Sequence, residues 1–411
     1  MTAGRLADRT ARIASSPTMQ VTSMVDRLRR EGVAVLDFGA GEPDFSTPPA
    51  IAAAGHAAID RDFTKYTPVG GTMALKQAIC ARYGADYGVR YDPAEVLVTA
   101  GGKQALFNTA LALFGPGDEV VLHTPGWPTL VEQVKLAEAT PVIVDLRPED
   151  GFALTAQAFL RAVTPRTRGV VVNSPCNPTG ALMPEGEFAA LADACAARGI
   201  WLVLDLCYEK LIYDPGPPHN LPRVLATHCP GLGVICGSAS KAYAMTGWRL
   251  GWTIAPPAVI AAQSAIQSHA TSNASSISQQ AVLEALTGSQ APVAAMLDEY
   301  RHRRDRLHEW LTRDLPYRAE LPAGAFYLFV DVRPLLAPGG PRSSNEFAQA
   351  LLDAQRVAVT PGEAFGAPGF VRLSYATSMA TLEEGSRRMA AFARALRGPA
   401  AAPASAAHGS D

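Results

Sequence analysis

The chain has 411 residues, of which 48% are hydrophobic and 18% charged, and its formal net charge is -2 at pH 7. This length and hydrophobicity allow a large core, which we expect to form one major domain with a smaller one beside it. Charges of both signs are mixed along the chain, which excludes the basic stripe that nucleic-acid binding requires and favours a small-molecule partner.

The cysteines and the N-terminus indicate where the protein works. The six cysteines are scattered singly, without a CxxC pair or the alternation with histidine that holds zinc. This pattern is typical of a reducing cytoplasm, and it predicts no metal site. The N-terminus lacks the apolar core of a signal peptide, and no apolar run approaches the roughly 20 residues of a membrane span. We therefore expect a cytoplasmic protein that does not enter a membrane.

Short apolar runs rich in β-branched residues alternate with helical patterns along the first part of the chain. Their hydrophobicity is continuous rather than alternating, which predicts strands covered on both faces, as in a largely parallel α/β sheet. Helices are expected at 103–114 and 185–198, each closed by glycine. In such folds the ligand binds outside the carboxyl ends of the strands. The expected strands are 96–100, 119–124, 141–146, 169–173, 201–206 and 233–238.

The pattern changes near residue 291. A long charged helix over 298–311 precedes an apolar strand at 324–332, a helix near 345–355, a strand at 371–376 and a final helix, which together predict a second α+β domain. The end of the chain is rich in Ala, Pro and Ser and has too little hydrophobic bulk to fold. The expected units are an N-terminal segment that packs on the small domain (1–45), a large domain (46–290), a small domain (291–397) and a disordered tail (398–411).

The segment that follows the strand at 233–238 is the most informative one. Ser238 and Ser240 can donate hydroxyl hydrogen bonds, and Arg249 offers two parallel donors to a phosphate dianion. Lys241 then lies within reach of a carbonyl carbon, and burial beside a cation would depress its pKa and make it nucleophilic. Taken alone, Ser-x-Ser-Lys more often marks a loop that enters a helix, so this interpretation depends on other parts of the chain.

Three further segments of the chain support the interpretation of Lys241. Asp205 ends a strand, where a carboxylate can keep a pyridine nitrogen protonated, and Tyr208 can donate to a phenolic oxygen. A helix N-cap is an equally good interpretation of Asp205. Asn177 lies in a Pro- and Gly-rich turn, which is otherwise an ordinary turn. At Gly102 and Lys103 a strand leads into a helix, whose N-terminal amides form an anion site.

Several separated motifs agree in order and spacing with one family. From about residue 15 to 395 the chain resembles the class I aminotransferases of the pyridoxal-phosphate (PLP) dependent transferase fold type I, and within them the bacterial aspartate/prephenate branch. The resemblance implies an α/β fold with a largely parallel sheet in a large domain and a smaller α+β domain. The motifs are GEPDF (41–45), KYTPVGG (65–71), GGKQALF (101–107), NSPCNPTG (173–180), DLCYEKL (205–211), SASKAYAMTGWRLG (238–251), GAFY (324–327) and VRLSYA (371–376).

The resemblance implies PLP as the cofactor and assigns the catalytic residues. Lys241 resembles the lysine that carries the cofactor as a Schiff base and moves the proton of the substrate α-carbon. Asp205 resembles the partner of the pyridine nitrogen, while Asn177 and Tyr208 resemble the donors to the phenolic oxygen. Trp127 resembles the aromatic residue that stacks on the ring, although a half-buried loop indole is the simpler alternative.

The resemblance also implies the remaining contacts. Tyr66 resembles a residue that reaches the phosphate from the neighbouring subunit, so we expect a homodimer with shared active sites. Arg372 resembles the residue that binds the substrate α-carboxylate, assisted by Gly41 and Asn177. Independently of the resemblance, an arginine on an otherwise apolar strand indicates a buried anion as its partner. The expected phosphate-binding groups are Ser238, Ser240, Arg249, Tyr66 and the amides of Gly102 and Lys103.

Substrate choice is the least determined property. Lys103 and Thr18 resemble groups near the distal carboxylate of a substrate, which favours aspartate or glutamate. The chain departs from that branch, since residues 17–20 read Pro-Thr-Met-Gln instead of Pro-Ser-Ala-Thr and Gly126 replaces a tyrosine. Aromatic, prephenate-like or specialised-metabolite amino acids therefore stay open as substrates. So does lyase, synthase or oxidase chemistry with PLP on the same scaffold.

Overall fold

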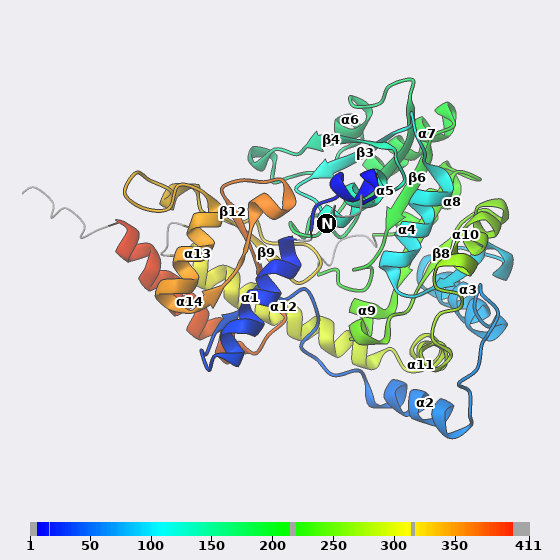
Figure 1. The fold of residues 1–411 in the computed structure, drawn as a ribbon, viewed down its shortest axis with the longest axis horizontal. Helices are drawn as coiled ribbons and strands as arrows, with labels where there is room; N and C mark the ends of the chain where they lie inside the picture. Colours follow the sequence, from blue (N-terminus) through cyan, green and yellow to red (C-terminus); the bar gives the residue numbers. More distant parts are fainter. Residues whose placement is uncertain (1–5, 16, 214–218, 314–316, 398–411) are drawn as a thin grey trace, which may run out of the picture.

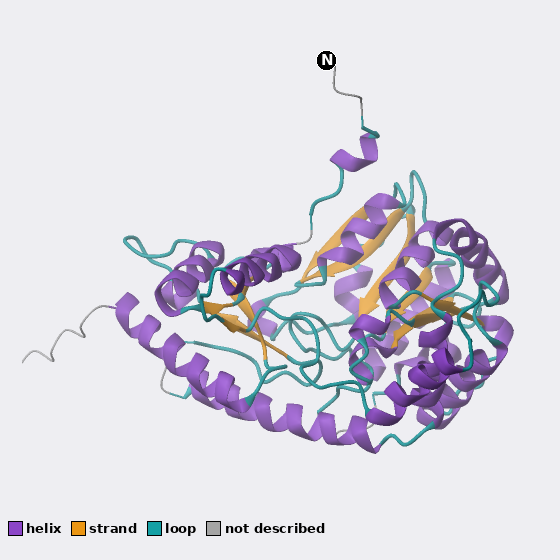
Figure 2. Ribbon diagram, turned by 60° about the horizontal axis from the view of Figure 1, so that its bottom comes forward, coloured by secondary structure: helices purple, strands orange, loops and turns teal. Residues whose placement is uncertain are grey.

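The computed structural model describes residues 6–15, 17–213, 219–313 and 317–397, with only the backbone described at 17–19. The expected disordered tail, 398–411, lies outside these residues. Two sheets, one large and one small, organise the structure, and a long helix runs past both (Figures 1 and 2).

The larger sheet has seven strands and carries the carboxyl-terminal strand ends that the sequence singles out. Its neighbouring strands are parallel except at β8, which is antiparallel to both β2 and β7. The predicted α/β class with a largely parallel sheet is confirmed, and each of the strands expected in this sheet is present. In spatial order the strands are β2 (Val96–Thr99), β8 (Gly251–Ile254), β7 (Gly233–Ser238), β6 (Trp201–Asp205), β5 (Thr167–Asn173), β3 (Glu119–Thr124) and β4 (Thr140–Asp145).

Strand β8 differs from the sequence-based prediction. No strand was expected after 233–238 in this part of the chain, yet Gly251–Ile254 pair with β2 on one side and β7 on the other. Trp252 and Ile254 are 1% and 2% exposed, so burial in the sheet stabilises this short strand. A run of four residues carries too little periodicity for a strand to be recognised from sequence.

Both faces of the large sheet are covered, which explains the continuous hydrophobicity of its strands. Along β5, Val170 and Val172 join one core cluster while Val171 joins the other. Successive side chains of a strand point to opposite faces, so each face needs its own apolar set. One face packs against α4 (Gly102–Leu113), α5 (Pro128–Leu136) and α10 (Pro257–Ala270). The other packs against α3 (Met73–Tyr87), α6 (Ala156–Leu160), α7 (Glu185–Arg198), α8 (Leu221–His228) and α11 (Ser276–Thr287), with α2 (Pro49–Asp60) outside α11.

The smaller sheet is antiparallel and has its own core. Its order is β11 (Thr360–Pro361), β12 (Phe370–Ser374) and β9 (Tyr327–Asp331). The helices around it are α12 (Ala291–Thr312), α13 (Ser344–Gln355) and α14 (Met379–Arg397). The three helices and two strands expected after residue 291 are therefore all found. Figure 1 shows α12 running from beside the small sheet towards α9 (Ala239–Ala242) and α11.

The N-terminal residues lie beside the small sheet. Helix α1 (Pro17–Arg30) shares a small apolar cluster with α13 through Val25 and Leu352. Strand β1 (Leu36–Asp37) pairs in parallel with β10 (Val357–Ala358). This pairing joins segments from the two ends of the sequence. The stretch after β1 then passes close to the polar strand ends, where the Gly39 and Gly41 carbonyls accept from Arg372 and Lys241.

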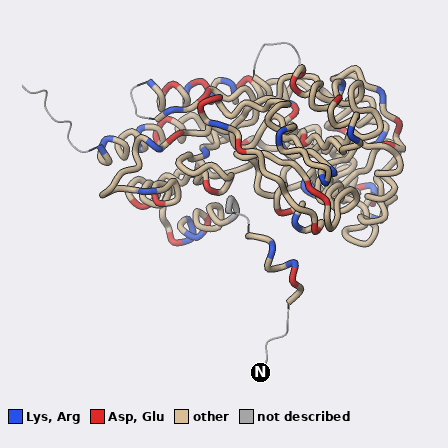
Figure 3. The backbone as a smooth tube through the Cα atoms, turned by 90° about the horizontal axis from the view of Figure 1, so that it is seen from above, with Lys and Arg blue, Asp and Glu red and all other residues tan. Residues whose placement is uncertain are grey.

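Charged side chains are spread over the molecule. Figure 3 shows Lys and Arg interspersed with Asp and Glu along the tube, with no region in which one sign dominates. Among the described residues, none of the helices has the length and hydrophobicity to span a bilayer, and no three His, Cys, Asp or Glu side chains are grouped in a way that could hold a metal ion.

Candidate active site

Lys241 lies at the carboxyl end of β7, on the short helix α9 (Ala239–Ala242). Its Nζ donates to the carbonyl oxygen of Gly41 and lies 5.9 Å from the centre of the Phe326 ring. Burial lowers the pKa of Lys241, and the nearby Arg372 and Arg249 act in the same direction. An amine whose protonated form is disfavoured is a better nucleophile and base than a solvated lysine.

Asp205, the last residue of β6, is a buried carboxylate. It is 2% exposed, and within the described part of the chain it forms no ion pair. Its Oδ2 accepts from Asn173 Nδ2 at 3.1 Å, and its Oδ1 accepts from the amide of Cys207 at 3.0 Å. Burial nevertheless raises its pKa to about 7. The contact with the Cys207 amide resembles a helix cap, but a carboxylate buried this deeply is stabilised in its charged form only by a cation beside it.

Arg372 on β12 is the matching buried cation. It is 2% exposed, and none of the described carboxylates pairs with it. Its two terminal nitrogens donate to Asn177 Oδ1 at 3.0 Å and to the Gly39 carbonyl at 2.9 Å. Its Nε is buried and has no hydrogen-bond acceptor among the described residues. A guanidinium with an unused buried donor is poised to bind a carboxylate.

A chain of side-chain hydrogen bonds joins the two charges. Asn173 donates to Asp205, and Asn173 Oδ1 accepts the amide of Asn177 at 2.8 Å. Asn177 in turn accepts from Arg372 through its own Oδ1. Because β5 and β6 end side by side and β12 faces them, residues far apart in sequence meet at one place. The unpaired anion and the unpaired cation are thus fixed relative to each other.

Two tyrosines complete this cluster. The hydroxyls of Tyr208 and Tyr327 are 2.8 Å apart, and the Arg372 guanidinium lies 4.2 Å above the Tyr327 ring. Burial raises the pKa of Tyr208, so its hydroxyl keeps its proton and can donate. A Cβ on Gly41 would lie 3.4 Å from the Tyr327 hydroxyl, which brings the loop after β1 to the same cluster.

A second group of polar residues forms a cup where α4 begins. Ser238 Oγ accepts from the Ser240 amide at 3.1 Å and donates to Ser240 Oγ at 2.9 Å. Gly101 precedes α4 with a φ of 90°, and a Cβ there would lie 2.5 Å from Arg249 Nη2. Arg249 forms no ion pair with a described carboxylate. Free helix amides, hydroxyls and a guanidinium together form an anion site.

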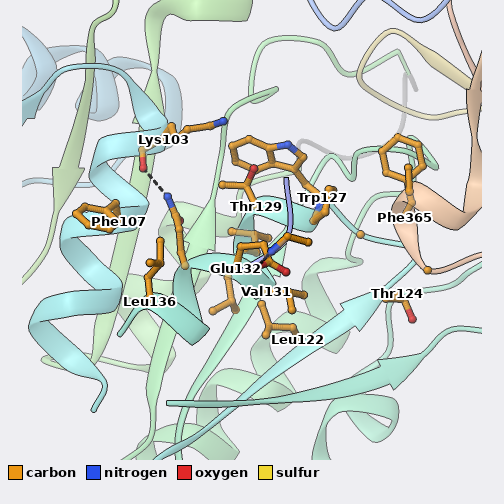
Figure 4. A pocket seen from close by; sticks show the side chains of 18 of the residues that line it. Lys103, Phe107, Leu122, Thr124, Trp127, Thr129, Val131, Glu132, Leu136 and Phe365 are labelled. Carbon is orange, nitrogen blue, oxygen red and sulfur yellow. Dashed lines mark hydrogen bonds between the residues drawn. The ribbon is translucent and has the colours of Figure 1, made fainter. Parts of the chain in front are cut away.

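Lys103 and Trp127 lie at the side of this cup. Lys103 Nζ is 5.1 Å from the centre of the half-buried Trp127 ring (Figure 4). Burial lowers the pKa of Lys103, and the charge of Arg249 adds to the effect. Two cations so close to each other and to a helix N-terminus attract an anion.

Two predicted residues have no described contact with the cluster. Tyr66, in the loop between α2 and α3, is 90% exposed. Thr18 lies in α1, but its side chain falls outside the described atoms, so its expected place near a substrate carboxylate stays a prediction.

Three residues of the site had no assigned role in the sequence interpretation. Asn173 and Tyr327 both lie within motifs quoted above, NSPCNPTG and GAFY, and that is the only signal that marked them. Phe365, in the 3-10 helix η6 (Gly362–Phe365), lies 4.9 Å from the Arg372 guanidinium. These residues act through contacts across the fold, which local sequence patterns do not encode.

These groups suit one kind of ligand. Such a ligand has a ring nitrogen that becomes cationic beside Asp205, a phosphate for the cup, and a carbonyl carbon for Lys241. Pyridoxal phosphate has all three groups, and Arg372 remains free for the carboxylate of a second molecule. The residues present therefore fit this cofactor together with an amino acid.

Comparison with known proteins gives the same result. The sequence profile of the family described as aminotransferase class I and II matches residues 33–389. The chain is 41% identical over 391 residues to an aspartate aminotransferase of Geobacillus stearothermophilus, covering 95% of this chain and 99% of that protein. It is 42% identical over 395 residues to a probable aspartate/prephenate aminotransferase of Thermus aquaticus, with the same coverage of 95% and 99%.

A solved structure agrees as closely. The aspartate aminotransferase from Thermus thermophilus, with maleate, superimposes with a TM-score of 0.89 at 40% sequence identity, covering 95% of this chain and 100% of that chain. Sequence and structure thus match from near one end of the chain to the other.

Proposed function

The chain belongs to the class I and II aminotransferases, and on that premise we propose that its site moves an amino group between aspartate or glutamate and a 2-oxo acid. The chain is an aminotransferase, and the cofactor of its family is pyridoxal phosphate. The observation that carries the proposal is the pair of buried, unpaired charges, Asp205 and Arg372, held by one hydrogen-bond chain beside Lys241.

In this proposal each polar group of the site has one role towards the cofactor. The Ser238 and Ser240 hydroxyls, Arg249 and the amides of Gly102 and Lys103 bind the phosphate. Trp127 stacks on the ring, and Tyr208 and Asn177 donate to its phenolic oxygen. Asp205 holds the protonated ring nitrogen. When bound, the cofactor supplies a ring that accepts the electron pair left when the substrate α-carbon loses its proton.

The residues of the chain orient the amino acid and move its proton. Arg372 binds the α-carboxylate and, with Asn177 and the Gly41 backbone, fixes the direction of the bond from the α-carbon to its hydrogen. Lys241 Nζ takes that proton and returns it to the carbon of the cofactor that receives the amino group. Since a second 2-oxo acid must reverse the path before the next cycle, ping-pong kinetics are expected.

Aspartate and glutamate are proposed on two grounds. The relatives described above are named for aspartate or for aspartate and prephenate. Lys103 presents an ammonium beside Trp127, at a helix start where a cation opposes the helix dipole unless an anion binds there. A distal substrate carboxylate supplies that anion.

A homodimer with shared sites is part of the proposal. Tyr66 is 90% exposed in the single chain, although tyrosine is on average a partly buried residue. A phenol that crosses to the phosphate cup of a second copy accounts for this exposure.

The test is stoichiometry. Purified protein with PLP is mixed with aspartate or glutamate, and the consumption of a 2-oxo acid acceptor is compared with the loss of the donor. One acceptor consumed per donor, with parallel lines in double-reciprocal plots, supports amino transfer. Release of ammonia without consumption of the acceptor assigns the site to elimination or oxidation, and the proposal then fails.

A further inference from the structure

The loop between α2 and α3, residues 61–72, carries the exposed Tyr66 and contacts two buried glutamines. Gln267 comes from α10 and Gln279 from α11, and each side chain is 0% exposed. These two helices pack against α4 and α3 (Figure 1). A buried amide destabilises the fold unless its polar atoms are paired, so both glutamines need hydrogen-bond partners inside the protein.

Gln267 connects the loop to the large sheet and to α4. Its Nε2 donates to the Val69 carbonyl of the loop and to the Val98 carbonyl of β2, both at 2.9 Å. Its Oε1 accepts from Nδ2 of Asn108, on α4, at 3.0 Å. Both amide hydrogens of Gln267 and its carbonyl oxygen are therefore used, and one side chain joins the loop, β2 and α4.

Gln279 holds two further points of the loop. Its Nε2 donates to Thr67 Oγ1 and to the Ala274 carbonyl, both at 2.9 Å. Its Oε1 accepts from the amide of Thr72, the N-cap of α3, at 2.9 Å. Since Thr67 follows Tyr66 directly, Gln279 fixes both the residue beside the phenol and the point where the loop enters α3.

The backbone of the loop has little freedom between these contacts. The Val98 amide donates to the Gly70 carbonyl at 3.0 Å. Gly71 has a φ of 95°, and a Cβ there would lie 2.4 Å from Val98 Cγ2, so only glycine allows this close approach to β2. The segment 67–72 is therefore held at both ends and along its middle, while the neighbouring Tyr66 stays exposed.

Burial of an amide on α10 does not by itself produce these contacts. Gln263 lies one turn before Gln267 and is also 0% exposed. Its Nε2 donates to Thr109 Oγ1, on α4, at 3.0 Å, and its Oε1 has no partner among the described residues. Gln267 and Gln279, in contrast, pair every polar atom of their amides, and each does so partly with the loop. Their common feature is the loop that carries Tyr66.

We propose that Gln267 and Gln279 are positioning residues for the active site of the second subunit, because they hold the loop so that Tyr66 presents its phenol to the phosphate cup of that subunit. The inference rests on the proposed function, and within it on the homodimer with shared sites. A loop that is ordered before the cofactor binds loses little conformational entropy on binding. The hydrogen bond of Tyr66 then contributes fully to cofactor affinity.

The test measures cofactor affinity in variants that release the loop. Gln267→Met and Gln279→Met keep the approximate side-chain length and remove the hydrogen bonds. Thr67→Val removes one loop contact of Gln279, and it serves if the glutamine variants fail to fold. Gln263→Met is the matched control, since it changes the same residue type on α10 without touching the loop. The readout is the PLP concentration at which borohydride traps the cofactor on half of the Lys241 side chains, which requires no turnover.

Two mixed dimers, isolated through two different affinity tags, show on which subunit the glutamines act. Each contains one protomer with Lys241→Ala, so only the other protomer can be trapped. In the first dimer, Gln279→Met is on the protomer that keeps Lys241, whose site then receives the native loop. In the second, Gln279→Met and Lys241→Ala are on the same protomer, so the remaining native site receives the altered loop.

The expected loss follows the loop. As homodimers, Gln267→Met and Gln279→Met weaken cofactor affinity by about three- to tenfold, and Gln263→Met by less than about twofold. The first mixed dimer keeps native affinity, whereas the second is as weak as the Gln279→Met homodimer. Gln279→Met adds no further loss to Tyr66→Phe, because the contact that it supports is already missing.

Other outcomes overturn the inference. These are a loss that follows the protomer bearing Lys241, an equal loss from Gln263→Met, losses that add to that of Tyr66→Phe, or no loss from any loop variant. A protein that sediments as a monomer overturns it as well, and leaves amino transfer to the stoichiometry test. A loss that follows the loop, in a protein that consumes no 2-oxo acid acceptor, supports the positioning role and refutes the proposed function.

Discussion

Two regions of the site differ in whether their charged side chains have partners. Around Lys241, the buried charges of Asp205 and Arg372 have no described ion-pair partner. In the mostly apolar cavity between α4 and α5, which Phe107, Trp127 and Leu136 line, carboxylates such as Glu132 already hold their partners. Buried charges destabilise a fold unless a counter-charge arrives, whereas apolar surface needs only contact. The first region is therefore suited to charged ligands, while the second offers mainly apolar contact.

Replacing Lys241 should give the largest effect, because it removes both the covalent attachment of the cofactor and the group that moves the proton. Lys241→Ala is expected to lower kcat more than about 10⁴-fold. Mass spectrometry after borohydride reduction should find the cofactor on the peptide that contains Lys241 in the wild type. Lys103→Ala is the control and should keep that label. Label on another lysine of the wild type would contradict the assignment.

Asp205→Asn should have the next largest effect. The amide keeps the shape and can accept one of the two hydrogen bonds of Asp205, but it cannot hold a cationic ring nitrogen, so the rate of the half-reaction with aspartate is expected to fall by about 10²–10³. The affinity for the cofactor should fall less, by about tenfold, since the phosphate cup provides most of it and the contact with the ring nitrogen a smaller part. Single-turnover kinetics and a cofactor titration measure the two quantities. A near-normal rate would leave Asp205 with only its capping contact to Cys207.

Lys103 lies where the two regions meet, so its replacement sharpens the comparison between them. Lys103→Ala is expected to lower the specificity constant for aspartate by roughly ten- to a hundredfold, because a charge-assisted contact contributes about 1.5–3 kcal/mol. Phenylalanine should lose little. Equal losses for both amino acids would instead indicate that Lys103 serves the phosphate.

Tyr66 should give a smaller effect, of about tenfold in cofactor affinity, which reflects one hydrogen bond to the phosphate. The sharper version mixes a Lys241→Ala protomer with a Tyr66→Phe protomer. If sites are shared, each mixed dimer has one site with both native residues, and half of its sites should bind the cofactor with native affinity. If sites are not shared, no mixed dimer has a native site, and this result would contradict the proposed crossing.

Much of the fold could be predicted because its signals are local. Continuous apolar runs gave the parallel strands of the large sheet, and the ends of those strands placed Asp205 and Asn177 near each other. Strand β8 was not predicted, because four residues are too few to show the hydrophobic pattern of a strand. The proposed domain limits at 45 and 290 stay a prediction, as do the residue roles within the site.

The parts that sequence did not reveal depend on packing between distant segments. Tyr327 meets Tyr208 and Arg372 only because β9 and β12 pair and face the end of β6. The apolar cavity between α4 and α5 depends on the spacing of these helices above the sheet, and no local sequence pattern encodes that spacing. Gly126 was visible as a departure from the family, but the lack of room for a side chain there, with a Cβ 2.3 Å from the His123 carbonyl oxygen, follows only from the fold.

The central claim is that Asp205 is a buried charge waiting for the cationic nitrogen of the cofactor, and stability against pH tests it most directly. The unfolded chain ionises Asp205 near 3.8, whereas burial raises its pKa to about 7 in the folded, cofactor-free protein. Stability is therefore lost as pH rises between these values, and the loss, on the order of 4 kcal/mol, is complete above pH 7.

The measurement is thermal unfolding of wild type and Asp205→Asn from pH 4 to pH 8, with and without PLP. Without PLP, the advantage of Asp205→Asn should grow from near zero at pH 4 to its maximum above pH 7, because the amide never ionises. Addition of PLP should stabilise wild type more than the variant and reduce this difference. Equal pH dependence in the two proteins, or equal stabilisation by PLP, would contradict the account.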